Sequence, residues 1–237
     1  MPKYTYLIFD VDDTLLDFYA AFSTAQKDIA DKLGIEMSEE YRKTDEALGW
    51  KAWDECGLNR TDDEDVQKNY HKYYFEYIKK HFAYLSEAYG RACGEQELTD
   101  CYLNSVSSSK VLKEADTLSV YEQLSKKYKL ILATNGLEKM QKERLTAFLP
   151  YTYRLYISEE IGFIKPTKEF FNHILTDLKC RPNACIIIGD SITNDIIGAK
   201  AVGMDVCYYN PKHKPVPDNV SVDYEIDTIS ALTQILP

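Results

Sequence analysis

The chain has 237 residues, of which 45% are hydrophobic and 28% are charged, as in one large globular domain or a core domain with an insertion. Its net charge of −10 argues against non-specific binding to nucleic acid or anionic membranes, which requires basic patches. No apolar run approaches the roughly 20 residues that span a bilayer, and the first residues show no signal-peptide pattern. We therefore expect a cytoplasmic protein without nucleic-acid or membrane partners.

The first predicted element is a buried strand over residues 4–9, which ends in two carboxylates, Asp10 and Asp12, followed by the hydroxyl of Thr14. Like charges this close repel each other, and their burial is costly unless a cation compensates. The pattern indicates a divalent metal and acid chemistry. Taken alone, the segment is also compatible with a polar turn after an edge strand.

Residues 17–108 are predicted to be almost entirely helical, an insertion between the first and second strands. One helix has an apolar stripe at three- and four-residue steps, formed by Phe22, Ala25, Ile29 and Leu33. His71 and His81 fall on a later polar and aromatic helix, and we expect both at its surface.

After the insertion, short apolar runs alternate with helical segments. The runs predict buried strands over residues 129–134, 153–157, 184–188 and 205–209. The segments between and before them predict helices over residues 117–127, 137–148, 167–178 and 193–202. This alternation indicates an α/β fold with a doubly wound, mostly parallel sheet.

Polar groups follow each of these strands. Thr134 and Asn135 end the second strand, Lys165 follows the third, and Asp190 and Asp195 follow the fourth. In a doubly wound sheet, ligands bind beyond the carboxyl ends of the strands. We therefore expect these groups to meet Asp10 and Asp12 at one edge of the sheet.

With these motifs in this order, the chain resembles a phosphatase of the haloacid dehalogenase (HAD) superfamily over essentially its whole length. The motifs are Asp10-Val-Asp12-Asp-Thr14, Thr134-Asn135, Lys165-Pro166 and Gly189-Asp190-Ser-Ile-Thr-Asn-Asp195. The resemblance implies a Rossmann-like core domain over residues 1–16 and 109–237 and an inserted helical C1 cap over residues 17–108. With Ser158-Glu-Glu-Ile-Gly before the lysine, the pattern is most similar to the 5′-nucleotidase branch. The sequence departs from the commonest family pattern at Asp13, where Gly is frequent, and we do not expect Asp13 to be catalytic.

The resemblance implies a role for each acidic residue. Asp10 is expected to attack phosphorus and form an aspartyl-phosphate. Mg²⁺ is expected as cofactor, held by Asp10, the backbone carbonyl of Asp12 and Asp190, with Asp195 as a ligand of metal-bound water or an orienting group. Asp12 is expected to protonate the leaving group and then deprotonate the attacking water.

The remaining site residues are expected to handle the phosphoryl group. Thr134 would hydrogen-bond a phosphoryl oxygen, helped by backbone N–H groups near Asn135. Lys165 would offset the negative charge that gathers on Asp10 and the phosphoryl group.

The sequence thus predicts a Mg²⁺-dependent phosphatase, a monomer or small homo-oligomer, acting on a small phosphate ester, with nucleoside 5′-monophosphates as the expected substrates. A sugar-phosphate phosphatase or a phosphomutase of the same superfamily is the alternative, because cap residues decide between them. A haloacid dehalogenase needs neither Mg²⁺ nor an acid at position 12. A phosphorylated receiver domain would need a phospho-acceptor aspartate at a later strand end, where Thr134 stands.

Overall fold

The computed structural model describes residues 3–60, 63–90 and 92–236. The chain divides into two compact units, one formed by Met1–Asp17 with Lys110–Pro237 and the other by Phe18–Ser109. We propose that these units are the core and cap domains. Across the described ranges, no helix is long and apolar enough to cross a membrane.

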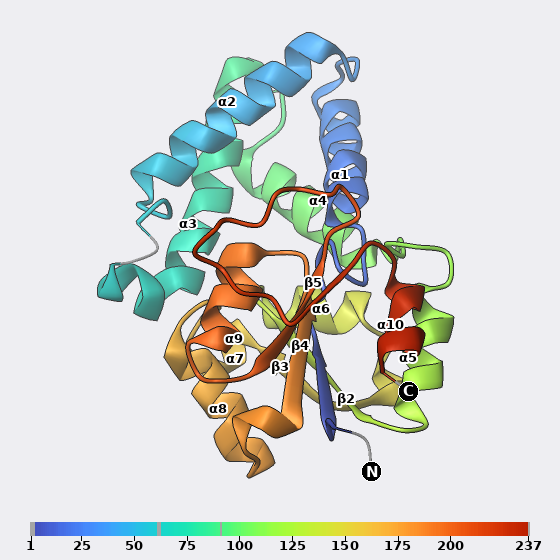
Figure 1. Cartoon of the computed structure of the whole chain (residues 1–237). Helices are drawn as coiled ribbons and strands as arrows, with labels where there is room; N and C mark the ends of the chain where they lie inside the picture. The colour runs from blue at the N-terminus through green and yellow to red at the C-terminus, as the bar shows by residue number, and fades with distance from the viewer. Residues whose placement is uncertain (1–2, 61–62, 91, 237) are drawn as a thin grey trace. The chain divides into compact units, whose positions relative to one another are not determined.

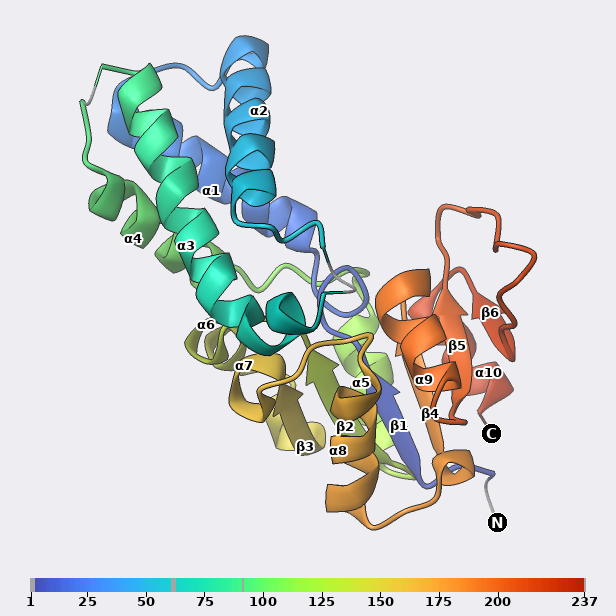
Figure 2. The ribbon, with the colours of Figure 1, turned by 90° about the vertical axis from the view of Figure 1, so that its left-hand side faces the viewer.

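The first unit contains a six-stranded parallel sheet with the order β3-β2-β1-β4-β5-β6 (Figure 1, Figure 2). Its strands are β1 (Tyr6–Phe9), β2 (Lys129–Thr134), β3 (Thr152–Ile157), β4 (Cys185–Gly189), β5 (Asp205–Tyr209) and β6 (Tyr224–Ile226). This sheet confirms the predicted α/β fold class. The chain order reverses between the neighbouring strands β1 and β4, which makes their carboxyl ends the expected ligand-binding point.

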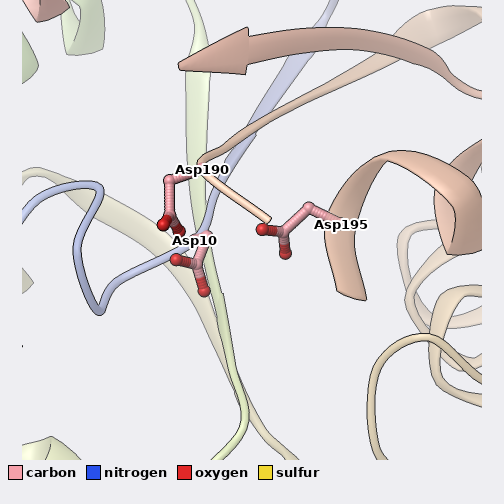
Figure 3. Close-up of side chains that lie close together, drawn as sticks. All are labelled: Asp10, Asp190 and Asp195. Atoms are coloured by element: carbon pink, nitrogen blue, oxygen red, sulfur yellow. The ribbon is translucent and has the colours of Figure 1, made fainter. Parts of the chain in front are cut away.

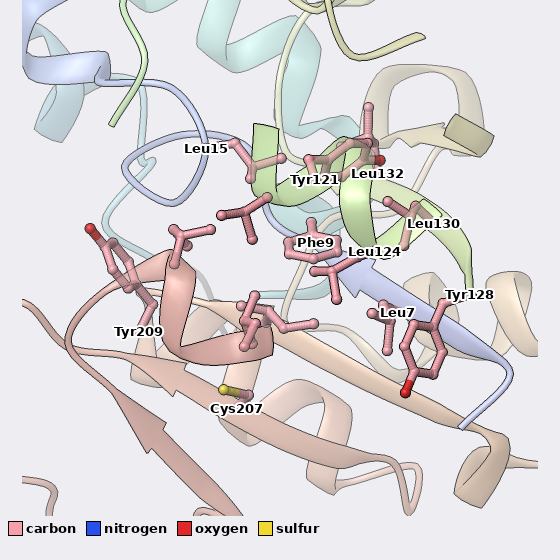
Figure 4. Close-up of a cluster of buried hydrophobic side chains, with 14 of the residues drawn as sticks. Leu7, Phe9, Leu15, Tyr121, Leu124, Tyr128, Leu130, Leu132, Cys207 and Tyr209 are labelled. Atoms are coloured by element: carbon pink, nitrogen blue, oxygen red, sulfur yellow. The ribbon is translucent and has the colours of Figure 1, made fainter. Parts of the chain in front are cut away.

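Both faces of the sheet are buried. Leu7 and Phe9 of β1 belong to one apolar cluster, which includes side chains of helix α5 (Thr117–Ser125), as Figure 4 shows. Ile8 points to the opposite face and belongs to a second cluster with helix α8 (Lys168–Leu178). Because side chains of a strand alternate between faces, a strand covered on both sides must be apolar throughout. The short apolar runs in the sequence therefore predict the strands of this sheet.

The other helical segments of this unit are short. They are α6 (Glu138–Arg144), α7 (Ser158–Ile161), α9 (Gly198–Lys200) and α10 (Leu232–Ile235), a π-helical turn over Ile192–Ile197 and 3₁₀ turns over Leu149–Tyr151, Pro182–Ala184 and Ile229–Ala231. The helix predicted over 137–148 is therefore shorter than expected. Strand β6 was not predicted, because its three residues at the sheet edge include only one, Ile226, that is buried.

The second unit is helical. It consists of α1 (Phe18–Leu33), α2 (Glu39–Glu55), α3 (Glu64–Ala88) and α4 (Glu95–Ser108), with α1 packed on α4 and α3 packed on both α2 and α4. Along the predicted stripe of α1, Ala25, Ile29 and Leu33 are buried and Phe22 is half-buried. Gly34 ends the helix with φ +68°, a conformation that glycine adopts without steric cost.

The expectation that His81 lies at the surface is wrong, since this side chain is only 4% exposed. His81 faces α2 at Gly49, where the absence of a side chain leaves room for the imidazole ring. There its Nε2 lies 2.9 Å from Oδ1 of the buried Asp45. His71 is half-buried.

Candidate active site

Three carboxylates meet at the carboxyl ends of β1 and β4. Asp10 directly follows β1, Asp190 follows β4, and Asp195 lies in the π-helical turn after it (Figure 3). One oxygen atom from each lies within 4.8 Å of the other two. Asp10 is 6% exposed and Asp195 is 1% exposed. The fold thus brings together three of the four predicted metal-binding residues.

Small neighbouring residues hold these carboxylates in place. A side chain at Gly189 would collide with the carboxylate of Asp195, so only glycine permits this approach. The backbone N–H of Ser191 donates to Asp195 Oδ2 at 3.1 Å. The buried Thr14 hydroxyl donates to Asp10 Oδ2 at 3.0 Å and accepts from the Asp190 backbone N–H at 3.1 Å. Thr14 therefore links the ends of β1 and β4.

Lys165 lies within the same cluster. Its ammonium donates to Asp10 Oδ1 at 2.5 Å and to Asp195 Oδ1 at 2.7 Å, and the residue is 2% exposed. Burial by itself would lower the pKa of this amine, but the two carboxylates outweigh burial and raise the pKa above its ordinary value. Lys165 is therefore a buried cation.

One lysine does not neutralise three carboxylates. Burial and the Asp10 carboxylate raise the pKa of Asp190 to about 7. Burial and Asp10 also raise the pKa of Asp195 to about 6, although Lys165 opposes them. A buried set of oxygen donors with excess negative charge fits a hard divalent cation such as Mg²⁺. The residues that would hold it are Asp10, Asp190 and Asp195.

Asp12 lies outside this cluster of carboxylates. Its side chain faces helix α6, where Gln141 Nε2 donates to Asp12 Oδ2 at 2.7 Å and Arg144 Nη1 contacts Asp12 Oδ1. Burial is the largest influence and raises the pKa of Asp12 above its ordinary value, while Arg144 acts in the opposite direction. Its hydrogen-bond partners thus hold the Asp12 side chain toward α6, and its predicted metal contact through the backbone carbonyl stays a prediction.

Sequence reasoning missed Gln141 and Arg144, although both are fully or almost fully buried. Gln141 Nε2 also lies 2.8 Å from Thr134 Oγ1, so this amide connects Asp12 to the end of β2. The available signal was their three-residue spacing, which places both side chains on one face of a helix directly after a predicted strand end.

Asn135 and Lys165 form a reciprocal pair. Asn135 Nδ2 donates to the Lys165 carbonyl at 2.9 Å, and the Lys165 backbone N–H donates to Asn135 Oδ1 at 2.8 Å. The Asn135 side chain therefore positions the loop that carries Lys165. A contact of this segment with substrate would come from backbone N–H groups and from Thr134, and it remains a prediction.

Asp13 occupies a left-handed turn with φ +61°. This conformation suits glycine and is tolerated by aspartate better than by most other residues. Lys113 Nζ lies 2.9 Å from Asp13 Oδ1. The departure from the family pattern thus leaves the backbone turn in place and gives its carboxylate a lysine partner.

Comparison with known proteins agrees with this geometry. A family model described as haloacid dehalogenase-like hydrolase matches residues 4–203. The chain is 31% identical to the HAD-hydrolase YfnB of Bacillus subtilis (strain 168), over 100% of this chain and 97% of that protein. It is 27% identical to the pyrimidine 5′-nucleotidase PynA of Streptococcus pneumoniae (strain ATCC BAA-255 / R6), over 98% and 95% of the two chains.

Solved structures show the same fold. The magnesium-bound crystal structure of Bacillus subtilis YfnB superposes with a TM-score of 0.81 at 28% identity, covering 99% of both chains. A 2-haloacid dehalogenase from Pseudomonas syringae pv. Tomato DC3000 superposes with a TM-score of 0.71 at 23% identity, covering 98% of both chains. With its strand-end motifs and the family model spanning most of its length, the chain belongs to the haloacid dehalogenase-like hydrolases.

Proposed function

We propose that this chain is a Mg²⁺-dependent phosphomonoesterase that uses Asp10 as nucleophile and acts on nucleoside 5′-monophosphates. The observation that carries the proposal is that two aspartates at one sheet edge have different partners. Asp10 contacts Lys165 and Thr14 among the clustered carboxylates, whereas the Asp12 side chain contacts Gln141 and Arg144.

In the first step, a carboxylate oxygen of Asp10 attacks phosphorus and the phosphorus–oxygen bond to the leaving group breaks. Thr14 and Lys165 hold the Asp10 carboxylate so that few rotamers remain open to it. The leaving oxygen takes a proton from Asp12, whose raised pKa favours the protonated form that this step needs.

In the second step, water attacks the phosphorus of the aspartyl-phosphate and Asp12 takes up its proton. Inorganic phosphate leaves, and the Asp10 carboxylate is restored. When bound, Mg²⁺ would supply the positive charge that lets a phosphate dianion approach the carboxylates. The buried Lys165 ammonium contributes one positive charge that also reduces the repulsion between the phosphate and the carboxylates.

Asp12 also favours phosphatase chemistry over dehalogenation. Displacement of a halide produces a weakly basic leaving group that needs no proton, so dehalogenation has no use for a half-buried acid with two hydrogen-bond partners at position 12. The structural likeness to a dehalogenase at 23% identity concerns the fold alone.

Relatives support nucleoside monophosphates as substrates. PynA, a pyrimidine 5′-nucleotidase, matches 98% of this chain. Two relatives named as phosphatases of other phosphate esters match only about half of this chain. They are the N-acylneuraminate-9-phosphatase of Rattus norvegicus, which matches 56%, and the glyceraldehyde 3-phosphate phosphatase of Methanothermobacter thermautotrophicus, which matches 51%.

The test is phosphate release by the purified protein from nucleoside 5′-monophosphates, sugar phosphates and p-nitrophenyl phosphate, with Mg²⁺ and with EDTA. We expect Mg²⁺-dependent release with the highest kcat/KM for a nucleoside monophosphate, and none from the matched variant Asp10→Asn. A preference for a sugar phosphate would contradict the proposed substrate class. Halide release from a 2-haloacid without phosphate release would contradict the proposed reaction.

A further inference from the structure

The helical unit contains a pocket of about 580 Å³ between helices α1, α2 and α3. Aromatic side chains form much of its lining, contributed by Tyr19 and Phe22 of α1, Trp50 and Trp53 of α2, and Tyr77 of α3. Trp50 is 64% exposed and Tyr19 is 76% exposed, an unusual state for such large rings. Trp53 is held edge-on against Tyr77, with ring centroids 5.2 Å apart. The pocket thus combines fixed aromatic walls with exposed rings.

A buried polar group lies among these walls. Asp45 is 2% exposed and lines the pocket together with His81 and Gln26. Gln26 Nε2 donates to Asp45 Oδ2 at 2.7 Å, and His81 Nε2 lies 2.9 Å from Asp45 Oδ1. Apolar residues would pack four helices at lower desolvation cost than a buried carboxylate and imidazole. Few polar groups fixed within a mostly apolar pocket are typical of a binding site that orients its ligand.

The shape and charge of the pocket narrow the class of ligand. Its volume suits a ligand of nucleoside size. Flat aromatic walls favour a ligand with a planar ring. The Asp45 carboxylate and the Gln26 amide could form hydrogen bonds with polar atoms at the edge of that ring. Besides Asp45 and His81, the charged lining residues are Arg42 and Glu46. Two acids against one arginine give no excess of positive charge, so the pocket is unsuited to a phosphate group.

We propose that this pocket binds a neutral, planar nitrogen heterocycle of nucleoside size, stacked on Trp50 and hydrogen-bonded beside Asp45. The choice of nucleosides as probes rests on the proposed function. The binding of a heterocycle in this pocket does not, because it requires no hydrolysis. The heterocycle has two possible sources, which the experiment separates. It is either the nucleoside part of the substrate or a free nucleoside bound independently of turnover.

The chain offers a direct readout. Its two tryptophans, Trp50 and Trp53, both line the pocket, so intrinsic tryptophan fluorescence reports on this region alone. The full-length protein is titrated with uridine, and in parallel with adenosine, neither of which carries a phosphate ester that could be hydrolysed. Ribose is the control for the sugar. We expect a saturable fluorescence change with a nucleoside and none with ribose.

Variants test the stacking contact. Trp50→Ala is expected to weaken nucleoside binding about tenfold, because it removes the aromatic ring on which the base would stack. Trp53 remains as the reporter in this variant, and Trp50→Phe should restore most of the affinity. Phe75→Ala removes a partly exposed aromatic ring of α3 outside the pocket lining and should leave binding unchanged.

Steady-state kinetics separates the two sources. Competitive inhibition of UMP hydrolysis by uridine, with a raised KM for UMP in Trp50→Ala, would identify the ligand as the nucleoside part of the substrate. Saturable uridine binding without competition would identify an independently bound nucleoside. Absence of saturable binding for both nucleosides, or equal affinity in Trp50→Ala, would overturn the proposal. Nucleoside binding by a protein that hydrolyses no phosphate ester would instead refute the proposed function and leave this inference standing.

Discussion

Replacing Lys165 by methionine removes the ammonium group that contacts both Asp10 and Asp195. The ammonium lies 2.5 Å and 2.7 Å from their oxygens, and all three side chains are at most 8% exposed. Solvent therefore cannot screen the loss, as it does for surface pairs that contribute about 0–1 kcal/mol. Removing one partner of a buried ion pair typically costs about 3–5 kcal/mol, because the remaining charges lose their compensation. We expect Lys165→Met to lower the free energy of unfolding by about this amount.

The assay is urea denaturation at neutral pH, once with EDTA and once with excess Mg²⁺. A cation that binds only the folded state adds about 2.7 kcal/mol when present at a hundredfold excess over its Kd. Without the ammonium, the carboxylate cluster is more negative. Mg²⁺ should therefore stabilise Lys165→Met more than it stabilises the wild-type protein, and it should recover part of the loss.

Lys168→Met is the matched control, since Lys168 is an exposed lysine three residues further along. It should change the free energy of unfolding by less than about 0.5 kcal/mol. A loss below about 1 kcal/mol for Lys165→Met in EDTA would refute the reasoning. It would mean that the ammonium does not compensate buried carboxylates in the folded protein.

Four further substitutions test individual residues of the site. Asp10→Asn removes the nucleophile, and kcat for phosphate release should fall at least about a thousandfold with an unchanged circular-dichroism spectrum; substantial residual turnover would contradict the assignment. Asp12→Asn should lower kcat about 10²- to 10⁴-fold and let phospho-enzyme accumulate in acid-quenched samples, so an undiminished rate would remove Asp12 from the acid/base role. Arg144→Lys keeps the charge but loses the guanidinium geometry at Asp12, and we expect kcat to fall with little change in KM, whereas a change confined to KM would count against a positioning role. Gly189→Ala places a Cβ against the Asp195 carboxylate, which should cost about 1–3 kcal/mol of stability and weaken Mg²⁺ binding measured by calorimetry; wild-type values for both would show that Asp195 has room to move.

The sheet could be predicted well because its signal is local. Each central strand is buried on both faces, so its apolar run is continuous and stands out from the flanking helices. Strand β6 could not be predicted, because an edge strand of three residues has no continuous apolar run. The helix over 137–148 was predicted too long, since its apolar spacing continues through Leu145 and Phe148, which pack into the core after the helix has ended.

Some residues of the site could likewise be predicted from the sequence, and others could not. Asp10, Thr134 and Asp190 follow apolar runs directly, and parallel strands bring such ends to one edge of a sheet. Gln141, Arg144 and His81 carried no comparable signal. Each is a polar residue on a helix, and the sequence alone does not distinguish one that faces water from one that contacts a carboxylate of another segment.

The α/β class and the order of Asp10, Asp190 and Lys165 along the strands could be inferred from the sequence, because the apolar runs and the polar residues that follow them lie within short segments of the chain. Only the tertiary structure showed that Asp12 is held by Gln141 and Arg144 from more than a hundred residues away, and that Asp45 and His81 meet inside a pocket of aromatic rings. The physical reason is that burial of a polar side chain is stable only with a partner, and that partner is supplied by whichever distant segment packs against it.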